Sequence, residues 1–237
     1  MATAACGKEG HAPGQQAAPS SAVPASVTPA QIDLPLCESV EPVAPAAARH
    51  ADCRLVPGDG SGSSLVVRYT IEAGTASESV VEIDSVGVEH PVVTESGINI
   101  QISPRLTDLD ADGRDDLILP RDTVANGNAT YVIYRSTTSG FVRAGTLSGF
   151  GPERTDTGYV AVAAKGGARF WNIGFWRFDN ASQLVAEAFV EIESEQKPGG
   201  TGRSTCRITD STGHATTNEL GSRFCGEPIV HRHTPFK

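Results

Sequence analysis

The residues from Asp108 to Leu117 carry the clearest chemistry of the chain, because carboxylates stand at every second position before a glycine. Ca²⁺ takes about 6 to 8 oxygen ligands, and carboxylates plus a backbone carbonyl from one curved segment can supply them. Gly113 permits the positive backbone dihedral with which such a loop closes on its ion. The pattern predicts a calcium loop over 108–116. The predicted ligands are the carboxylates of Asp108, Asp110, Asp112 and Asp116 and the backbone carbonyl of Arg114.

This loop opens like that of an EF-hand, but Leu119 stands at the twelfth position, where an EF-hand carries a bidentate glutamate. The apolar run 117–119 ends at Pro120, which favours a short strand over a flanking helix. Because one loop supplies most of the shell, the ion is expected to be structural. The alternative is a solvated acidic turn without an ion, which the repulsion between closely spaced carboxylates disfavours.

The elements that must position this loop are strands. From residue 64 onward, short runs alternate apolar and polar residues between Gly, Asn, Asp and Ser, which is typical of half-buried antiparallel strands. The sequence predicts a mainly β fold, either an antiparallel β-sandwich or a propeller-like sheet domain, with at most a short helical turn near residues 35–45. The predicted strands are 65–71, 80–85, 98–103, 116–119, 130–134, 141–145, 159–164, 170–178 and 184–193.

Two segments divide the chain. Residues 1–33 are rich in Ala, Pro, Ser, Gly and Gln and predict a flexible tether, whereas 34–237 predict one β-rich domain. Cys6 follows small residues as in the end of a bacterial lipobox, which predicts a lipidated cysteine after removal of a signal peptide. A free thiol on a tail of a cytosolic protein is the alternative. No run of about 20 apolar residues occurs, so the lipid is the expected link to a membrane.

The other four cysteines lie in two pairs that are close in sequence. We predict the disulfides Cys37–Cys53 and Cys206–Cys225, because short loops are the simplest pairing in an extracytoplasmic chain, although four cysteines allow three connectivities. Buried reduced thiols are the alternative. Disulfides persist in oxidising compartments, so paired cysteines would fit a location outside the cytoplasm.

Charge and motifs narrow the function classes. The formal net charge is -9 and the isoelectric point is near 5.1, which argues against nucleic acid and favours a basic protein partner. The six histidines stand in no nucleophile or zinc motif, so the chain is not expected to be an enzyme. The aromatic run 170–178 predicts a strand that is apolar on both faces, with an exposed contact patch around Trp176 as the functional alternative.

The order of signals from residue 98 to 193 carries a resemblance. It comprises Ile98-Asn-Ile-Gln-Ile102, the loop 108–117, Tyr131-Val-Ile-Tyr134, Thr138-Ser-Gly-Phe-Val142 and Leu147. This order resembles the calcium-binding, lysozyme-inhibitor-like immunity proteins of xanthomonad type IV bacteria-killing secretion systems. Similar loops, of the FG-GAP type, occur in integrin propellers, but there they recur in successive blades, whereas this chain has one.

The resemblance implies a periplasmic protein, lipid-anchored to the outer membrane, that binds a toxic peptidoglycan hydrolase as a monomer in a 1:1 complex. Such a protein blocks the cleft of the hydrolase with a loop and does no chemistry. The candidate partner-binding residues are Ser148, Gly149, Phe150, Glu153, Arg154 and Trp176, although 148–154 could be an ordinary surface loop. The alternatives are a calcium-stabilised adhesion or carbohydrate-binding module using Trp171 and Trp176, and a hydrolase without a recognised motif.

Overall fold

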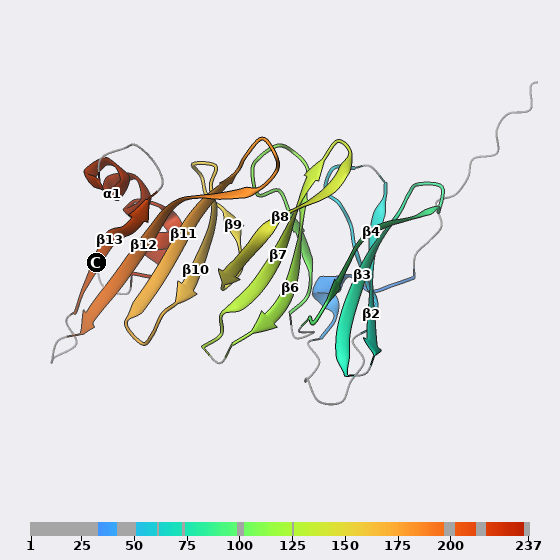
Figure 1. Ribbon diagram of the computed structural model, residues 1–237, viewed down its shortest axis with the longest axis horizontal. Helices are drawn as coiled ribbons and strands as arrows, with labels where there is room; N and C mark the ends of the chain where they lie inside the picture. The colour runs from blue at the N-terminus through green and yellow to red at the C-terminus, as the bar shows by residue number, and fades with distance from the viewer. Residues whose placement is uncertain are drawn as a thin grey trace, which may run out of the picture.

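Three antiparallel sheets make up the protein in a computed structural model (Figure 1). The structure describes residues 33–41, 51–60, 62–72, 74–98, 102–124, 126–196, 202–211 and 217–234. Strands account for 56% of the described residues and α-helices for 8%, which confirms the predicted mainly β class. Nearly all of the predicted tether, including Cys6, lies outside the described residues.

Each sheet is a meander in which strands that are consecutive in sequence pair with each other. Sheet A contains β1 (Cys53–Leu55), β2 (Ser64–Glu72), β3 (Thr75–Ile83) and β4 (Glu89–Ser96). Sheet B contains β5 (Arg105–Thr107), β6 (Asp116–Thr123), β7 (Ala129–Thr137) and β8 (Gly140–Gly149). Sheet C contains β9 (Glu153–Arg154), β10 (Val160–Lys165), β11 (Phe170–Phe178), β12 (Leu184–Gln196) and β13 (Gly202–Ser211). The helices are the 3₁₀ turn η1 (Cys37–Ser39), α1 (Thr217–Cys225) and α2 (Pro228–Arg232).

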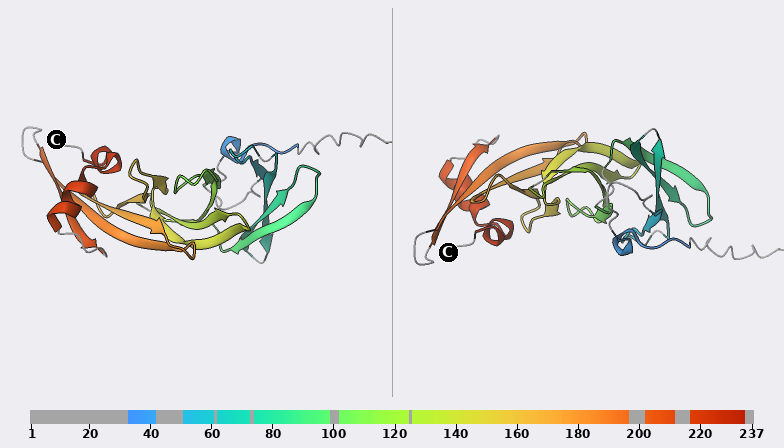
Figure 2. Two further views of the ribbon diagram at one scale, coloured as in Figure 1. Left: turned by 90° about the horizontal axis from the view of Figure 1, so that it is seen from above. Right: turned by 90° about the horizontal axis from the view of Figure 1, so that it is seen from below.

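The sheets stand face to face in a curved row, which the views from above and below show (Figure 2). The first strand of each sheet is short, with 3 residues in β1, 3 in β5 and 2 in β9. We call the concave edge the surface formed by η1, β1, β5, residues 108–115 and β9, which lie on the inner side of the curve. These three packed antiparallel sheets agree with the predicted fold, an antiparallel β-sandwich or propeller-like sheet domain.

Sheet B is buried on both of its faces. On one face Leu117, Leu119 and Val132 pack against Leu65 and Val67 of sheet A. On the other face, Ile118, Tyr131 and Ile133 pack against Val160 and Val162 of sheet C. Successive residues of a strand point to opposite faces, so a strand covered on both sides needs an unbroken apolar run. This burial explains why residues 117–119 are all apolar.

Sheet C uses its outer face to bury the C-terminal helices. Phe175, which is fully buried, packs with Ile173 of the same strand against Phe224 of α1 and Ile229 of α2. Trp176 and Phe178, which are only partly buried, point to the other face and join the core shared with sheet B. The prediction that residues 170–178 are apolar on both faces is therefore confirmed.

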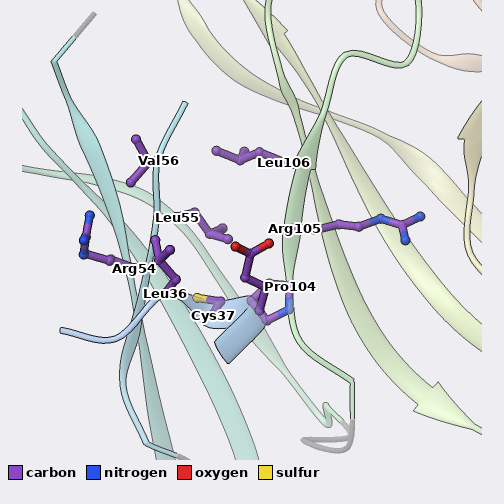
Figure 3. A pocket seen from close by; sticks show the side chains of 9 residues that line it. Leu36, Cys37, Arg54, Leu55, Val56, Pro104, Arg105 and Leu106 are labelled. Carbon is purple, nitrogen blue, oxygen red and sulfur yellow. The ribbon is translucent and has the colours of Figure 1, made fainter. Parts of the chain in front are cut away.

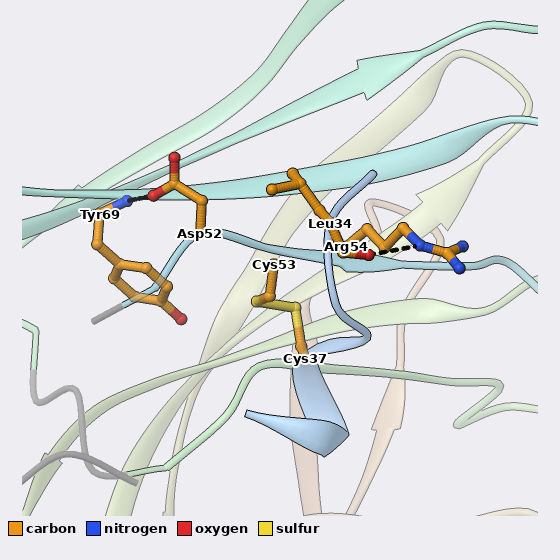
Figure 4. Close-up of a disulfide and its surroundings, with 6 residues drawn as sticks. All are labelled: Leu34, Cys37, Asp52, Cys53, Arg54 and Tyr69. Atoms are coloured by element: carbon orange, nitrogen blue, oxygen red, sulfur yellow. Dashed lines mark hydrogen bonds between the residues drawn. A yellow bond between two sulfur atoms is a disulfide. The ribbon is translucent and has the colours of Figure 1, made fainter. Parts of the chain in front are cut away.

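Both predicted disulfides are present. Cys37–Cys53 joins η1 to β1, and Cys206–Cys225 joins β13 to α1. Around the first of them, Arg54 Nε donates to the carbonyl of Leu34 over 2.9 Å (Figure 4). The disulfides are compatible with an extracytoplasmic location. Among the helices in the described part of the chain, none is long and apolar enough to cross a membrane.

The predicted elements differ from the observed ones in three places. The prediction of no helix beyond residue 45 was wrong, because α1 and α2 follow β13. The five strands β1, β4, β5, β9 and β13 were not predicted; three of them are too short to show any alternation. The predicted strand 98–103 is not seen, since 99–101 lie outside the described residues and the residues on either side are not in a strand.

Candidate metal site and the concave edge

Three carboxylates gather at the concave edge, in the segment between β5 and β6. Asp108, Asp110 and Asp112 each offer one oxygen, and these oxygens lie within 4.8 Å of one another. The backbone of this segment is sharply curved, since Ala111 and Gly113 have φ values of 63° and 84°. Oxygens at this separation can surround one cation, so the arrangement could hold a metal ion.

Backbone amides fix the curvature of this loop. The N–H groups of Asp112 and Gly113 donate to the carboxylate of Asp108 over 3.2 and 3.1 Å. The N–H of Arg114 donates to Asp112 Oδ1 over 2.9 Å. These bonds are the local turns that aspartate side chains favour, and they orient Asp108 and Asp112 toward the interior of the loop.

Asp116, the fourth predicted carboxylate ligand, is placed differently. Its side chain is only 1% exposed and accepts the N–H groups of Leu109, over 3.0 Å, and Ser136, over 2.9 Å. Burial raises the pKa of Asp116 to about 7; the two backbone donors oppose this rise, and the charges of Asp110 and Asp112 add to it. Asp116 therefore anchors the loop to β7 and is not among the three gathered carboxylates.

Three guanidinium groups neutralise the cluster from outside. Arg135 Nη2 of β7 lies 2.6 Å from Asp110 Oδ2, and Arg154 Nη1 of β9 lies 3.3 Å from Asp108 Oδ2. Arg114 pairs with Asp112 through its side chain. One oxygen is left over, because Asp110 Oδ1 is buried without a hydrogen-bond partner among the described residues. An inner oxygen of this kind suits a cation held by the loop.

The predicted partner segment 148–154 runs from the end of β8 in sheet B to β9 at the edge of sheet C and is held at several points. The N–H of Phe150 donates to the carbonyl of Ala163 over 2.8 Å, and Ser148 lies 3.4 Å from the hydroxyl of Thr130. Glu153 pairs with Arg232 of α2. The other end of the segment contacts the acidic loop through Arg154. The structure thus joins the two regions that the sequence singled out separately.

Both tryptophans are packed against other side chains. Trp171 has the ring of His233 at 4.1 Å and that of Phe150 at 5.3 Å. Trp176 lies over Gly174 and meets the ring of Phe189 edge-on at 5.5 Å. Phe150 itself is 46% exposed. Of the predicted aromatic contacts, Phe150 is the one that reaches the surface most fully.

A cleft of about 240 Å³ opens at the concave edge between sheets A and B. Most of the residues that line the cleft are apolar, and the side chain of Arg105 points away from it (Figure 3). Arg105 donates to the carbonyl of Pro152, and Arg54 donates to the carbonyl of Leu34, so both cations are bonded to backbone. The lining residues are Leu36, Cys37, Glu38, Arg54, Leu55, Val56, Pro104, Arg105 and Leu106.

The sequence did not reveal this cleft, because its walls come from short segments that show no alternation of their own. The Cys37–Cys53 disulfide holds one wall, and β5 supplies the other. Proline at 104 and the paired cysteines were the available signals, but they do not say which segments meet.

Comparisons with known proteins found no relative of this chain. No protein-family model, curated protein or solved structure matches this chain. Its function is therefore inferred from its own residues.

Proposed function

We propose that this chain is a periplasmic immunity protein that binds a toxic peptidoglycan hydrolase and blocks its active-site cleft, and that Ca²⁺ stabilises its scaffold. The observation that carries the proposal is the concave edge. It places a preformed apolar cleft and the acidic loop on one side of the molecule. The cleft suits a protruding side chain at the rim of the hydrolase's active site, and the exposed Phe150 of segment 148–154 would enter that active site.

The calcium part of the proposal rests on the three gathered carboxylates and on the unpartnered Asp110 Oδ1. Asp108, Asp110 and Asp112 would hold the ion, with the Arg114 carbonyl as a further donor. Asp116 would act on the loop indirectly, through the two amides that it binds. The ion would fix the loop between β5 and β6 and, through Arg154, the edge of sheet C.

Charge supports a basic partner. The net charge of -9 attracts a cationic protein and speeds its association. Within the cleft, both arginines are bonded to backbone carbonyls, so Glu38 is the ionisable lining residue that remains for a partner. An apolar side chain with a terminal cation, such as a lysine of the hydrolase, matches this lining.

The carbohydrate-binding alternative has less support. A sugar ring stacks on the open face of an aromatic side chain, and Trp171 is flanked by His233 and Phe150. Trp176 lies over Gly174. Neither tryptophan therefore offers the platform that the alternative needs.

The proposal is tested with the hydrolases encoded beside the gene, purified and mixed with this protein in calcium. We expect a 1:1 complex and loss of peptidoglycan cleavage. If none of these hydrolases binds or is inhibited, the immunity function is wrong. Binding to a glycan array instead would favour the carbohydrate module.

Val56 gives a sharper test of the binding surface, because it lines the cleft and is 51% exposed. Val56→Asp should weaken the hydrolase complex by about 100-fold, since loss of a central apolar contact costs on the order of 2 to 3 kcal/mol. Titration calorimetry measures the change in Kd. Val124→Asp is the matched control, because Val124 is 57% exposed and does not line the cleft. If Val56→Asp and Val124→Asp weakened the complex equally, the cleft would not be the binding surface.

A further inference from the structure

Two glutamates face each other inside the contact between sheets A and B. Glu78 of β3 pairs in register with Tyr69 of β2 on one side and Glu95 of β4 on the other. Residues directly opposite in an antiparallel pair have Cβ atoms about 4.5 to 5.5 Å apart, so the two carboxyl groups stand side by side. Glu78 is 1% exposed, and the side chain of Glu95 is 14% exposed.

The groups around the pair favour a charge on Glu95 only. Glu95 Oε1 accepts the hydroxyl of Tyr134 over 2.5 Å and lies 3.5 Å from Nε of the half-exposed Arg143. Glu78 hydrogen-bonds the hydroxyl of Tyr69, and its Oε1 is buried with no partner among the described residues. The pair therefore has one guanidinium group beside it, that of Arg143, and this group interacts with Glu95.

The remaining titratable neighbour does not supply a cation either. Asp52, which precedes β1, accepts the N–H of Tyr69 over 3.1 Å and adds a negative charge beside Tyr69 (Figure 4). Burial raises the pKa of Glu78 to about 8; the charge of Glu95 adds to this rise, and the hydrogen bond from Tyr69 opposes it. A fully ionised pair would leave two like charges in a dry contact with a single, partly exposed counter-ion.

We infer that Glu78 and Glu95 together bind one proton and act as a proton-dependent latch between sheets A and B. The proton resides on Glu78, because Glu95 already has the hydroxyl of Tyr134 and the guanidinium of Arg143. With the proton bound, the contact carries one carboxylate and one neutral carboxyl group that can donate a hydrogen bond. When the proton leaves, the two carboxylates repel each other and the contact between the sheets weakens.

The two sheets that the latch joins also form the walls of the concave cleft. The same contact buries Leu65, Val67 and Tyr69 of sheet A against Leu117 and Tyr134 of sheet B. The two walls of the concave cleft, Leu55 and Leu106, also belong to sheets A and B. A weaker contact would therefore loosen the cleft. The latch does not depend on what the cleft binds. A negative result in the unfolding test below would therefore leave the proposed immunity function unaffected, and failure to bind a hydrolase would leave the latch unaffected.

The test compares unfolding of the full chain and of Glu78→Gln from pH 5 to pH 9, with calcium present throughout. The folded pKa of Glu78 lies above its value in the unfolded chain, so the folded state retains a proton that the unfolded state has released. The pair's contribution is therefore greatest near pH 5 and is lost as the pH rises toward about 8. Glutamine keeps the shape and stays neutral. We expect the difference in Tm, variant minus parent, to increase by roughly 5 °C or more as the pH is raised from 5 to 9.

Other groups that titrate in the window, including Asp116, contribute equally to both proteins and cancel in the difference. Glu72→Gln serves as the control, because Glu72 is exposed on β2 of the same sheet and stands opposite Thr75, which does not titrate; its difference from the parent should not change with pH. A difference for Glu78→Gln that is also constant with pH would overturn the latch.

Carbon-detected NMR of the glutamate carboxyl groups provides a second measurement, and its main result comes from the parent protein alone. In the parent protein, the carboxyl carbon of Glu78 should titrate well above the ordinary range of glutamate, and Glu95→Gln should move that midpoint downward. An ordinary midpoint for Glu78 in the parent protein would also overturn the proposal.

Discussion

Saturating calcium is expected to raise the Tm of the protein by roughly 5 to 10 °C, and Asp110→Ala combined with Asp112→Ala is expected to abolish this rise. A ligand at about 100 times its Kd stabilises the native state by about 2.7 kcal/mol. For a chain of 237 residues, each kcal/mol shifts Tm by about 2 to 4 °C. The two substitutions remove two of the three carboxylates that converge at the concave edge. Scanning calorimetry with calcium and with chelator measures the effect.

Asp122→Ala combined with Asp156→Ala is the matched control, since both side chains are exposed and outside the cluster and the change in net charge is the same. The control should keep the full calcium response. A Tm that is the same with calcium and with chelator in the parent protein would mean that Arg135, Arg154 and Arg114 neutralise the loop without a metal. The double variant would then be destabilised under both conditions, because Arg135 would lose its partner.

Gly149→Ala is expected to lower the free energy of unfolding by about 2 to 4 kcal/mol. A Cβ at this position would lie 2.4 Å from the carbonyl oxygen of Ala163 and 2.8 Å from Val162 Cγ2, so β8 and β10 would have to separate. Overpacking costs about 1 to 3 kcal/mol, and the strain of a Cβ at the positive φ of this residue adds on the order of 1 kcal/mol. Urea unfolding measures the change.

Gly140→Ala separates steric overlap from backbone strain. Gly140 and Gly149 are the first and last residues of β8, and both have a positive φ, of 113° and 157°. No atom lies within 4 Å of a Cβ built at Gly140, so its substitution costs strain alone, on the order of 1 kcal/mol. Equal losses at the two positions would show that the close approach of sheets B and C at Gly149 contributes nothing to stability.

Local patterns in the sequence predicted much of the fold. The central strands alternate or run apolar over enough residues to be recognised, and the spacing of the aspartates identified the loop before β6. The helices were missed for a physical reason: α1 is 9 residues long, contains Gly221 and buries Phe224 within its last turn. A helix this short is stabilised by packing on sheet C and not by a periodic pattern of its own.

The parts of the site that were missed depend on contacts between distant segments. The spacing of the loop suggested Asp116 as a ligand, but Ser136, which lies 20 residues away, supplies an amide that binds its carboxylate. The pairing of Glu78 with Glu95 depends on strand register, which includes a bulge between Val80 and Val81. A glutamate at an inward position of β3 was the signal in the sequence, and its partner could be found only in three dimensions.

Because sheet B is buried on both faces, we expect it to be the last of the three sheets to unfold. Sheets A and C each contact sheet B and not each other through the cores described, so the row behaves like a chain of nearest neighbours. Either outer sheet can detach while the other two remain packed, but sheet B loses apolar cover whichever one leaves. Amide hydrogens of β6 and β7 should therefore exchange with solvent only on global unfolding, and those of β2 and β12 through smaller openings.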